Sequence, residues 1–432
     1  MRKSLGVFFA LIFMTSIVAF AQPRSKVSLA REILADSRLD TIQNKAIHLL
    51  TGFSAGTSYN EVWIRDFNTF IKGSLKVYPS DTVKNMLMLF FKIQGEDGNI
   101  VDGLVDTAKA HGGYAYRYSK LLPTWAAHKN TVETDQESSL IQAVKKYVDV
   151  TGDRSILQEQ IAGKSVVARM QDALLYVMKD RWSDQYGLVK GATTIDWGDV
   201  QPEAGWGVSI NEKTKWAIDI YDNAMFAIAI QDFISLKPAN FQAEKDWGKV
   251  AKDIKAHVRN YLWSASANKY RPHIYLNDRP FSKDFNEELR LYSGGSICAI
   301  IAGFNTKQEV IEINKQLRAA ASKEKFATIG MTVYPPYPLK EFPNMKPYLY
   351  QNAGDWTWFG GRIVEALLPY GLVAEAYHEL TPMLQRTIKY KGFFEWYDVQ
   401  NGSPSGSGNF RGEAGILYEA ITKLKAWAYK NK

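Results

Sequence analysis

The spacing of apolar residues constrains the fold of this chain more than any other feature of its sequence. Apolar side chains recur every three or four residues in long segments, and clusters of Gly, Pro, Asp and Asn separate the segments. The pattern predicts about twelve helices. They lie near residues 27–50, 61–78, 80–94, 136–150, 165–179, 219–236, 243–262, 293–304, 306–319, 353–369, 371–388 and 412–428.

Short and long connections alternate between these helices. Residues 79–81, 151–153 and 370–371 indicate tight turns, and Ser80 or Asp81 is expected to cap the helix that follows. Long, aromatic loops then lead to the next pair of helices. These loops span residues 95–135, 181–218, 264–292, 321–352 and 389–411.

Helical hairpins joined by long loops at one end predict an all-α fold, the (α/α)6 toroid, in which inner helices are ringed by outer ones. No linker rich in Pro or Ser divides the sequence, so residues 22–432 are expected to form a single domain. An open α-solenoid is the alternative. It would require a sequence period, which the chain lacks, and would not need such long loops.

The first residues predict a secretory signal peptide at residues 1–21. Arg2 and Lys3 precede an apolar run from Leu5 to Phe20, and Ala19-Phe20-Ala21 forms a small-x-small site after which cleavage is expected. The run is too short and wrongly flanked for a membrane anchor. We therefore expect an exported protein, periplasmic or secreted, without a membrane anchor.

Composition and motifs exclude several classes of function. A single cysteine, Cys298, excludes a disulfide framework. The formal net charge is +8, but the basic residues are scattered and form no face suited to nucleic acid. The six His residues form no cluster with metal-ligand spacing, so neither a metal nor a cofactor is expected. The sequence contains no nucleophile elbow, Walker loop or dinucleotide fingerprint.

What remains is a set of carboxylates placed among aromatic residues, of which Glu395 is the most conspicuous. It lies in the segment Gly392–Asp398 beside Trp396, and a loop rich in Gly and Ser follows. Aromatic surroundings raise the pKa of a carboxyl group and stack on sugar rings. The simpler interpretation is a solvated Glu in a surface turn.

Two further carboxylates lie at predicted starts of inner helices. Trp63 is followed closely by Arg65 and Asp66, which can offer a forked donor and an acceptor to vicinal hydroxyls. Asp135 lies in the acidic segment 133–140, whose acids can face the same pocket. The structural alternatives are an ordinary ion pair for the first and a helix N-cap for the second.

The segment 193–203 offers a candidate general acid. Asp196 and Asp199 flank Trp197, and a carboxyl buried against Trp can keep its proton to near neutral pH. The alternative is a turn rich in Asp and Gly.

The segment 350–362 has the composition of a sugar subsite at a helix start. Its candidate substrate-binding residues are Gln351, Asn352, Asp355, Trp356 and Trp358. The alternative is a helix cap with Trp side chains packed between helices.

In their order along the chain, these motifs resemble the six-hairpin (α/α)6 glycosidases. The resemblance is strongest to bacterial and archaeal amylo-α-1,6-glucosidase proteins, processing α-glucosidase I, neutral trehalase and neutral invertase, and it extends over nearly the whole mature chain. The matching motifs are Trp63-Ile64-Arg65-Asp66, the segment from Asp135 to Asp153, Trp197-Gly198-Asp199 and Glu395-Trp396-Tyr397-Asp398.

The resemblance implies roles for these residues. Arg65 and Asp66 would bind hydroxyls of the sugar in subsite −1, and Glu395 would be the general base. A Trp-x-Asp motif makes Asp199 the general acid, whereas the Ser-Gly-x-Asp motif of related glucosidases and trehalases aligns with Asp196. We favour Asp199 as the general acid and keep Asp196 as the alternative.

The family also implies an inverting mechanism and exo cleavage of a terminal α-glucoside from an oligosaccharide. Trp197, Trp356, Trp358 and Trp396 would wall the pocket, and the enzyme is expected to be a monomer. Two alternatives stay open. One is an α/α-barrel lyase or unsaturated-glycuronyl hydrolase acting on uronates, and the other is a non-catalytic periplasmic carbohydrate-binding protein.

Overall fold

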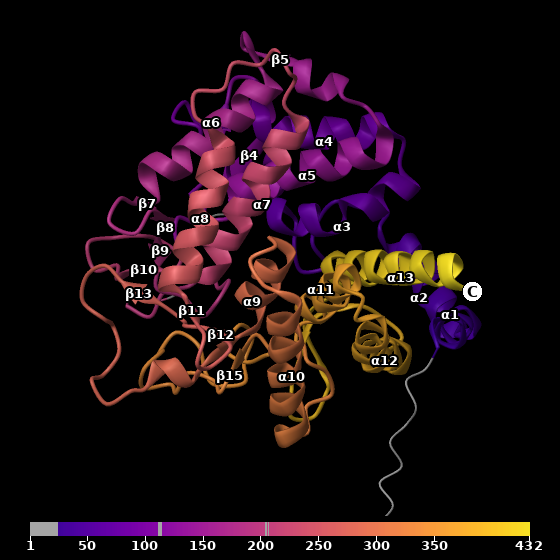
Figure 1. Cartoon of the computed structure of the whole chain (residues 1–432). Helices are drawn as coiled ribbons and strands as arrows, with labels where there is room; N and C mark the ends of the chain where they lie inside the picture. The colour runs from indigo at the N-terminus through magenta and orange to yellow at the C-terminus, as the bar shows by residue number, and fades with distance from the viewer. Residues whose placement is uncertain (1–24, 111–114, 204, 206) are drawn as a thin grey trace, which may run out of the picture.

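The computed structural model describes residues 25–110, 115–203, 205 and 207–432, and it places the helices around a common axis (Figure 1). The predicted signal peptide, residues 1–21, lies outside the described residues.

Six helices form a closed inner ring. Each packs against the next in chain order, and the last packs against the first. These helices are α3 (Ile64–Val77), α5 (Gln136–Thr151), α7 (Ile220–Leu236), α9 (Ser293–Ile301), α11 (Thr357–Leu367) and α13 (Arg411–Asn431). The predicted (α/α)6 toroid is therefore confirmed.

The remaining long helices form the outer layer. They are α2 (Ser37–Leu49), α4 (Ser80–Lys92), α6 (Val166–Asp180), α8 (Trp247–Tyr261), α10 (Lys307–Glu324) and α12 (Val373–Tyr390), with α1 (Lys26–Ala35) packed on α13. Helix α8 buries only Trp247, Ile254 and Val258, whereas every residue of α11 except Glu365 is buried. An outer helix needs one apolar stripe, but an inner helix is enclosed on all sides.

The structure corrects two predictions about helix ends. The helix predicted at 27–50 is broken at Asp36, whose carboxylate accepts the Arg38 N–H at 3.1 Å and caps α2. The Asp36 carboxylate also binds the Arg38 side chain and the Tyr377 hydroxyl, which fixes the break. Pro79, and neither Ser80 nor Asp81, occupies the N-cap position of α4, and its side chain makes no capping hydrogen bond.

The long loops carry short antiparallel strands. One sheet has the order β1-β2-β4-β3 and another the order β13-β10-β9; the other strands form two-stranded pairs. The strands are β1 (Val62–Trp63), β2 (Gly103–Asp106), β3 (Arg117–Ser119), β4 (Leu122–His128), β5 (Gln160–Ile161), β6 (Lys164–Ser165), β7 (Trp182–Ser183), β8 (Leu188–Val189), β9 (Gly191–Ala192), β10 (Trp216–Ile218), β11 (Trp263–Ser264), β12 (Lys269–Tyr270), β13 (Ile274–Tyr275), β14 (Leu291–Tyr292), β15 (Val333–Tyr334), β16 (Phe394–Tyr397) and β17 (Pro404–Gly408).

These loops and strands bring the N-terminal ends of the inner helices to one mouth of the toroid. Residues at the starts of α3 and α11, and the N-cap residue Phe410 of α13, line the same cavity. The positive ends of the helix dipoles therefore point toward this cavity, where they favour negative charge.

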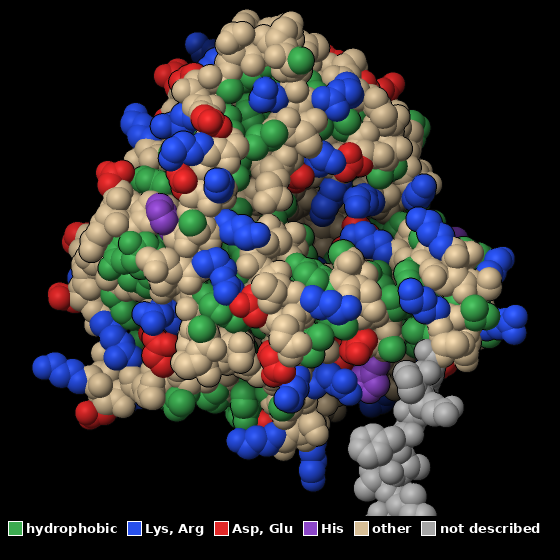
Figure 2. All heavy atoms as spheres, in the orientation of Figure 1, with side chains coloured by type: hydrophobic (Ala, Val, Ile, Leu, Met, Phe, Trp, Pro, Cys, Tyr) green, Lys and Arg blue, Asp and Glu red, His purple; other side chains and the backbone are tan. Residues whose placement is uncertain are grey.

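Two surface properties complete the description. Figure 2 shows Lys and Arg side chains spread over one face and interleaved with Asp and Glu, in agreement with the scattered charge of the sequence. Among the helices of the described residues, none combines the length and apolarity that a membrane crossing requires.

The closure of the ring depends on Gly415, which lets α13 approach α3. A Cβ atom added at this position would lie 2.6 Å from Phe70 Cα, so Gly415→Ala must push the two backbones apart. We expect this substitution to lower the free energy of unfolding by about 1–3 kcal/mol, measured by urea denaturation.

Gly248→Ala is the matched control, because a Cβ on this residue of α8 would meet only Asp246 Oδ1, at 3.3 Å. Equal stability of the two variants would contradict the role given to Gly415.

Candidate active site

A cavity of about 180 Å³ opens at the mouth where the inner helices begin. It is lined by acidic and aromatic side chains, with Arg65 as the only Lys or Arg among its described lining residues. The lining residues are Ala55, Tyr59, Trp63, Ile64, Arg65, Asp66, Asp102, His128, Asn130, Glu133, Trp197, Asp199, Val208, Tyr350, Trp356, Trp358, Glu395 and Phe410.

Trp358, which lines the cavity, takes part in hydrogen bonds that cross the ring. Trp358 Nε1 and Arg362 Nη2, both on α11, donate to the hydroxyl of Thr69 on α3, at 2.7 and 2.9 Å. Helices α11 and α3 are not neighbours in the ring, because α13 lies between them. These bonds therefore span its interior.

Glu395 is held at the cavity by the hairpin of β16 and β17. It lies where the register of the two strands shifts, and its side chain is largely buried. Its carboxylate accepts the Tyr59 hydroxyl at 2.6 Å, the Ser407 N–H at 2.8 Å and the Tyr350 hydroxyl at 3.2 Å. Burial raises the pKa of Glu395, although these three donors oppose the effect.

Asp199 faces the same cavity from the loop before α7. Its N–H donates to Gln351 Oε1 at 3.2 Å, and its carbonyl accepts Asn130 Nδ2 at 3.0 Å. Burial raises the pKa of the Asp199 carboxyl, while the charge of Arg65 acts against it. A carboxyl that keeps its proton to higher pH is suited to general acid catalysis.

Asp196 points away from the cavity and caps a helix. Its backbone has φ of 53°, and its carboxylate accepts the N–H groups of Gly294 and Gly295, at 2.6 and 2.8 Å, at the start of α9. Burial raises the pKa of Asp196 to about 7. Of the two acids that the sequence left open, Asp199 is therefore the one that reaches the cavity.

Arg65 forms ion pairs with two carboxylates. It forms a bidentate pair with Asp135 at 2.7 and 2.8 Å and lies 3.0 Å from Glu133. Asp135 also accepts the Tyr221 hydroxyl at 2.8 Å, and it occupies the N-cap position of α5 without capping through its side chain. Burial would raise the pKa of Asp135, but the charge and hydrogen bonds of Arg65 outweigh it and lower the pKa.

Asp66 is the third carboxyl that faces the cavity beside Glu395 and Asp199. Burial raises its pKa to about 7; the Arg65 charge opposes this effect, and the Glu395 charge adds to it. Its Oδ1 atom is buried and has no hydrogen-bond partner among the described residues. A hydroxyl of a bound ligand would satisfy this oxygen.

The aromatic wall is centred on Trp197. Its ring lies 4.8 Å from that of Trp356 and 5.3 Å from that of Trp358, edge to face, and Arg65 lies 5.7 Å from its centroid. These Trp residues line the cavity together with Trp63. The remaining candidate, Trp396, packs against Tyr350 behind the wall.

The polar residues predicted at 351–355 support the site from behind rather than line it. Gln351 holds the backbone of Asp199. Asn352 bonds the backbone of Tyr337 and Met345, and Asp355 forms a buried ion pair with Arg386 at 2.6 Å. The structure therefore favours the interpretation of this segment as a structural support.

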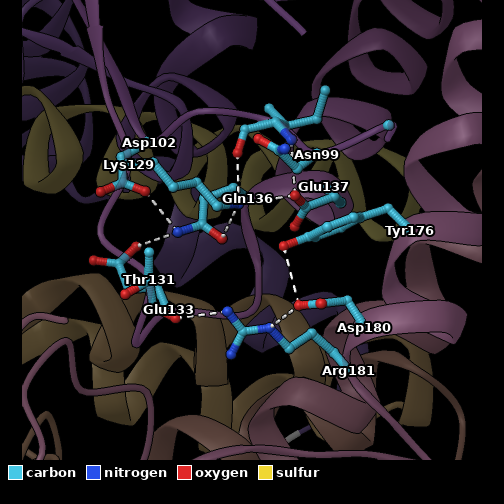
Figure 3. A network of polar contacts seen from close by, with 12 residues as sticks. Asn99, Asp102, Lys129, Thr131, Glu133, Gln136, Glu137, Tyr176, Asp180 and Arg181 are labelled. Atoms are coloured by element: carbon cyan, nitrogen blue, oxygen red, sulfur yellow. Dashed lines mark hydrogen bonds and ion pairs between the residues drawn. The ribbon is translucent and has the colours of Figure 1, made fainter. Parts of the chain in front are cut away.

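A polar network extends outward from the cavity-lining residues Asp102 and Glu133 (Figure 3); Glu133 lies in the acidic segment 133–140, whereas Asp102 had no motif in the sequence. Gln136 Nε2 donates to Asp102 Oδ1 at 2.6 Å and lies 3.4 Å from Glu133 Oε2, while Lys129 Nζ binds the Glu137 carboxylate at 2.9 Å. Burial raises the pKa of Asp102 to about 7.

Several lining residues gave no signal in the sequence. They are Tyr59, Asp102, His128 and Asn130, which belong to segments without a recognisable motif, and only the fold brings them to the cavity. Tyr350 is the first residue of the predicted segment 350–362 but was not among its candidate binding residues, and its φ of 49° is unusual for a bulky residue. Within the described part of the chain, no group of three or more His, Cys, Asp or Glu side chains is arranged to hold a metal ion.

Comparisons with known proteins identify the fold. No family model and no curated protein matches the sequence. Among solved structures, the GH63 mannosylglycerate hydrolase from Thermus thermophilus in complex with glucose matches with a TM-score of 0.64 and 15% identity over 88% of this chain and 99% of that chain.

Two rhamnosidases match over comparable parts of this chain. The Klebsiella oxytoca enzyme with rhamnose bound has a TM-score of 0.57 and 16% identity over 89% of this chain and 63% of that chain. The GH78 rhamnosidase of Bacillus sp. GL1 has a TM-score of 0.58 and 14% identity, covering 89% of this chain and 34% of that chain. The fold is thus that of (α/α)6-barrel glycoside hydrolases, which confirms the resemblance seen in the sequence at the level of the fold.

The buried carboxyl of Asp66 predicts a pH dependence of stability. An unfolded Asp ionises near pH 4, whereas burial raises the pKa of Asp66 to about 7 in the folded protein. Between these values the folded state binds more protons, so the free energy of unfolding falls as pH rises, by up to about 1.4 kcal/mol per pH unit.

In Asp66→Asn the free energy of unfolding should decrease less steeply with pH, as measured by urea denaturation between about pH 4 and pH 7. The control is Asp278→Asn, which removes a carboxyl whose side chain is 92% exposed. An unchanged slope in Asp66→Asn would show that Asp66 is ionised throughout.

Proposed function

We propose that this protein is a glycoside hydrolase in which Asp199 is the general acid and Glu395 the general base. The observation that carries the proposal is that both carboxyls face one aromatic cavity from loops far apart in the sequence. The fold adds support, because the matching solved structures are glycoside hydrolases.

Burial raises the pKa of both carboxyls, and they differ in the hydrogen bonds that they accept. The Asp199 carboxyl accepts no hydrogen bond at its buried Oδ1 atom from the described residues, and burial favours its protonated form. Glu395 instead accepts three hydrogen bonds, which stabilise the carboxylate. Asp199 is thus equipped to donate a proton, and Glu395 to accept one.

In the proposed reaction, Asp199 protonates the glycosidic oxygen as its bond to the anomeric carbon breaks. Glu395 removes a proton from a water molecule whose oxygen attacks that carbon from the opposite face. This inverting scheme expects the two carboxyls to lie about 6.5–9.5 Å apart, with the water between the base and the sugar. Trp197 and its neighbouring rings would shield the reaction from other water.

Binding of the terminal sugar is assigned to the carboxyls of Asp66, Asp102 and Glu133. Each lines the cavity and can accept hydrogen bonds from hydroxyls. Arg65 already binds Asp135 and Glu133. Its proposed role is therefore to hold these carboxylates in place rather than to donate hydrogen bonds to the sugar.

The proposed cleavage is exo, at the non-reducing end of an oligosaccharide. The cavity is small, and Trp358, one of its lining residues, is tied across the ring to Thr69; a small cavity suits one terminal residue better than the interior of a long chain. A terminal α-glucoside is the substrate we favour. Glucose is bound in the mannosylglycerate hydrolase structure and rhamnose in one rhamnosidase structure.

The uronate-specific alternatives receive less support. A lyase or glycuronyl hydrolase must bind a carboxylate, but the cavity contains five carboxyl side chains and Arg65, which is already paired. Burial lowers the pKa of His128 to about 4, so this His is uncharged at neutral pH.

The signal peptide predicted at residues 1–21 further suggests that the enzyme acts on sugars outside the cytoplasm.

The test is a panel of α- and β-linked di- and oligosaccharides, with release of the terminal sugar as the readout. Glu395→Gln and Asp199→Asn should each retain the fold and lose roughly two or more decades of kcat/KM. Asp196→Asn is the discriminating variant. Because Asp196 caps α9 outside the cavity, this substitution should reduce stability while the folded fraction keeps its rate.

Near-full activity of Glu395→Gln would overturn the assignment of the base. Loss of rate in a stably folded Asp196→Asn, with an active Asp199→Asn, would transfer the role of the acid to Asp196. Sugar binding without turnover would favour a carbohydrate-binding protein.

A further inference from the structure

Glu395 lies opposite a β-bulge that aims its side chain. Phe394 pairs with Gly408 and Trp396 with Ser405, so Gly406 and Ser407 together face the single residue Glu395. Gly406 has φ of 67°, the left-handed conformation that a bulge of this kind requires. A Cβ atom at position 406 would collide with the Glu395 carboxylate and lie 2.8 Å from Trp396 Cδ1. The bulge thus provides both the space and one N–H donor for this carboxylate.

Two tyrosine hydroxyls converge on one oxygen of the carboxylate. Tyr59 donates to Glu395 Oε1 at 2.6 Å and Tyr350 donates to the same atom at 3.2 Å, whereas Oε2 accepts only the Ser407 N–H among the described residues. A carboxylate has about four acceptor positions. Three are occupied, and the one that is left belongs to Oε2.

The loop that carries Tyr59 is fixed to the same hairpin. Thr57 donates to the Gly408 carbonyl through its N–H and its hydroxyl, both at 3.0 Å, and the Ser58 N–H donates to Ser407 Oγ at 3.1 Å. Tyr59 is therefore positioned by the strand that also supplies the Ser407 N–H.

Tyr350 reaches Glu395 from a second element that is tied to the hairpin. Asp355 and Tyr397 exchange backbone hydrogen bonds at 2.9 and 2.8 Å, so the segment before α11 extends the edge of β16. Tyr350 itself adopts φ of 49°, a conformation that is unfavourable for a bulky side chain and persists only where the surroundings impose it.

We propose that Tyr59 and Tyr350 are positioning residues for the general base: their hydroxyls hold Glu395 by Oε1 and leave Oε2 to receive the proton of the attacking water. The inference rests on the proposed function, because it assumes that Glu395 accepts that proton. It assigns the two tyrosines to the base rather than to the sugar.

The charged groups around Glu395 define what the tyrosines must offset. Asp66 of α3 and Asp199 of the loop before α7 face the same cavity, and the charge of Asp199 raises the pKa of Glu395. On the far side of the hairpin, Glu413 of α13 accepts the Phe394 N–H and the Tyr397 hydroxyl. The charge of Asp199 favours the protonated form of Glu395, and the hydrogen bonds to the carboxylate oppose this effect.

Loss of either tyrosine hydroxyl should therefore make Glu395 harder to ionise. The acidic limb of the pH profile of kcat/KM reports the ionisation of the base in the free enzyme. In Tyr59→Phe the midpoint of this acidic limb should shift to higher pH by about one pH unit, because one hydrogen bond to a charged group is lost. Tyr350→Phe should move it less, because its bond is longer, and KM should change little in both variants.

The control is Tyr377→Phe, which removes a comparable hydroxyl-to-carboxylate bond of 2.9 Å, to Asp36, outside the cavity. Its acidic limb should match that of the wild type. The proposal would be overturned if the acidic limb keeps its midpoint pH in Tyr59→Phe and Tyr350→Phe while KM rises. The tyrosines would then be contacts of the sugar.

A second measurement does not depend on turnover. Infrared difference spectra between each protein and its Glu395→Gln counterpart isolate the carbonyl stretch of protonated Glu395, whose titration should move upward in Tyr59→Phe. Identical titrations in wild type and both tyrosine variants would also overturn the inference. An unreactive wild type with shifted titrations would instead count against the proposed hydrolase activity and leave the hydrogen-bonding role intact.

Discussion

The ion pair between Arg65 and Asp135 is the interaction on which the rest of the site depends. It joins the starts of α3 and α5, and through the Tyr221 hydroxyl it extends to α7, so three successive inner helices meet at one buried carboxylate. Removing one partner of such a pair leaves an uncompensated buried charge, which costs about 3–5 kcal/mol. The same guanidinium holds Glu133 at the cavity wall. The ring geometry and the placement of the carboxyls are therefore coupled.

A cavity rich in carboxyls is stable only if most of its charge is neutralised, shared or protonated. Arg65 neutralises part of it, the N-terminal ends of the inner helices contribute favourable dipoles, and burial keeps protons on Asp66 and Asp102 toward neutral pH. The carboxylate form of Glu395 is instead stabilised by three hydrogen-bond donors. Burial raises the pKa of both Glu395 and Asp199, and the two carboxyls differ in the hydrogen bonds they accept, which is the difference on which their proposed roles as base and acid rest.

The sequence predicted the helical architecture well, because helix period and burial leave a direct trace in the order of apolar residues. The break at Asp36 was not predicted; its carboxylate caps α2 locally through the Arg38 N–H and also accepts the Tyr377 hydroxyl, a contact that only the fold supplies. The site was harder to predict. Sequence motifs marked acids beside Trp, but only the fold decides that Asp199 faces the cavity while Asp196 caps α9 and Asp355 pairs with Arg386. Tyr59 had no motif at all, because its role arises from the docking of its loop on the β16–β17 hairpin.

The configuration of the first product tests the proposed catalytic pair most directly. Proton NMR of a fresh reaction on the substrate that the enzyme cleaves distinguishes the two anomers before mutarotation mixes them. We expect inversion, with a β-sugar released first from an α-glycoside, because Glu395 activates a water on the face opposite the leaving group. Release of the α-anomer would mean that a carboxylate attacks the sugar itself, and it would contradict the assignment of Glu395 as the base of an inverting pair.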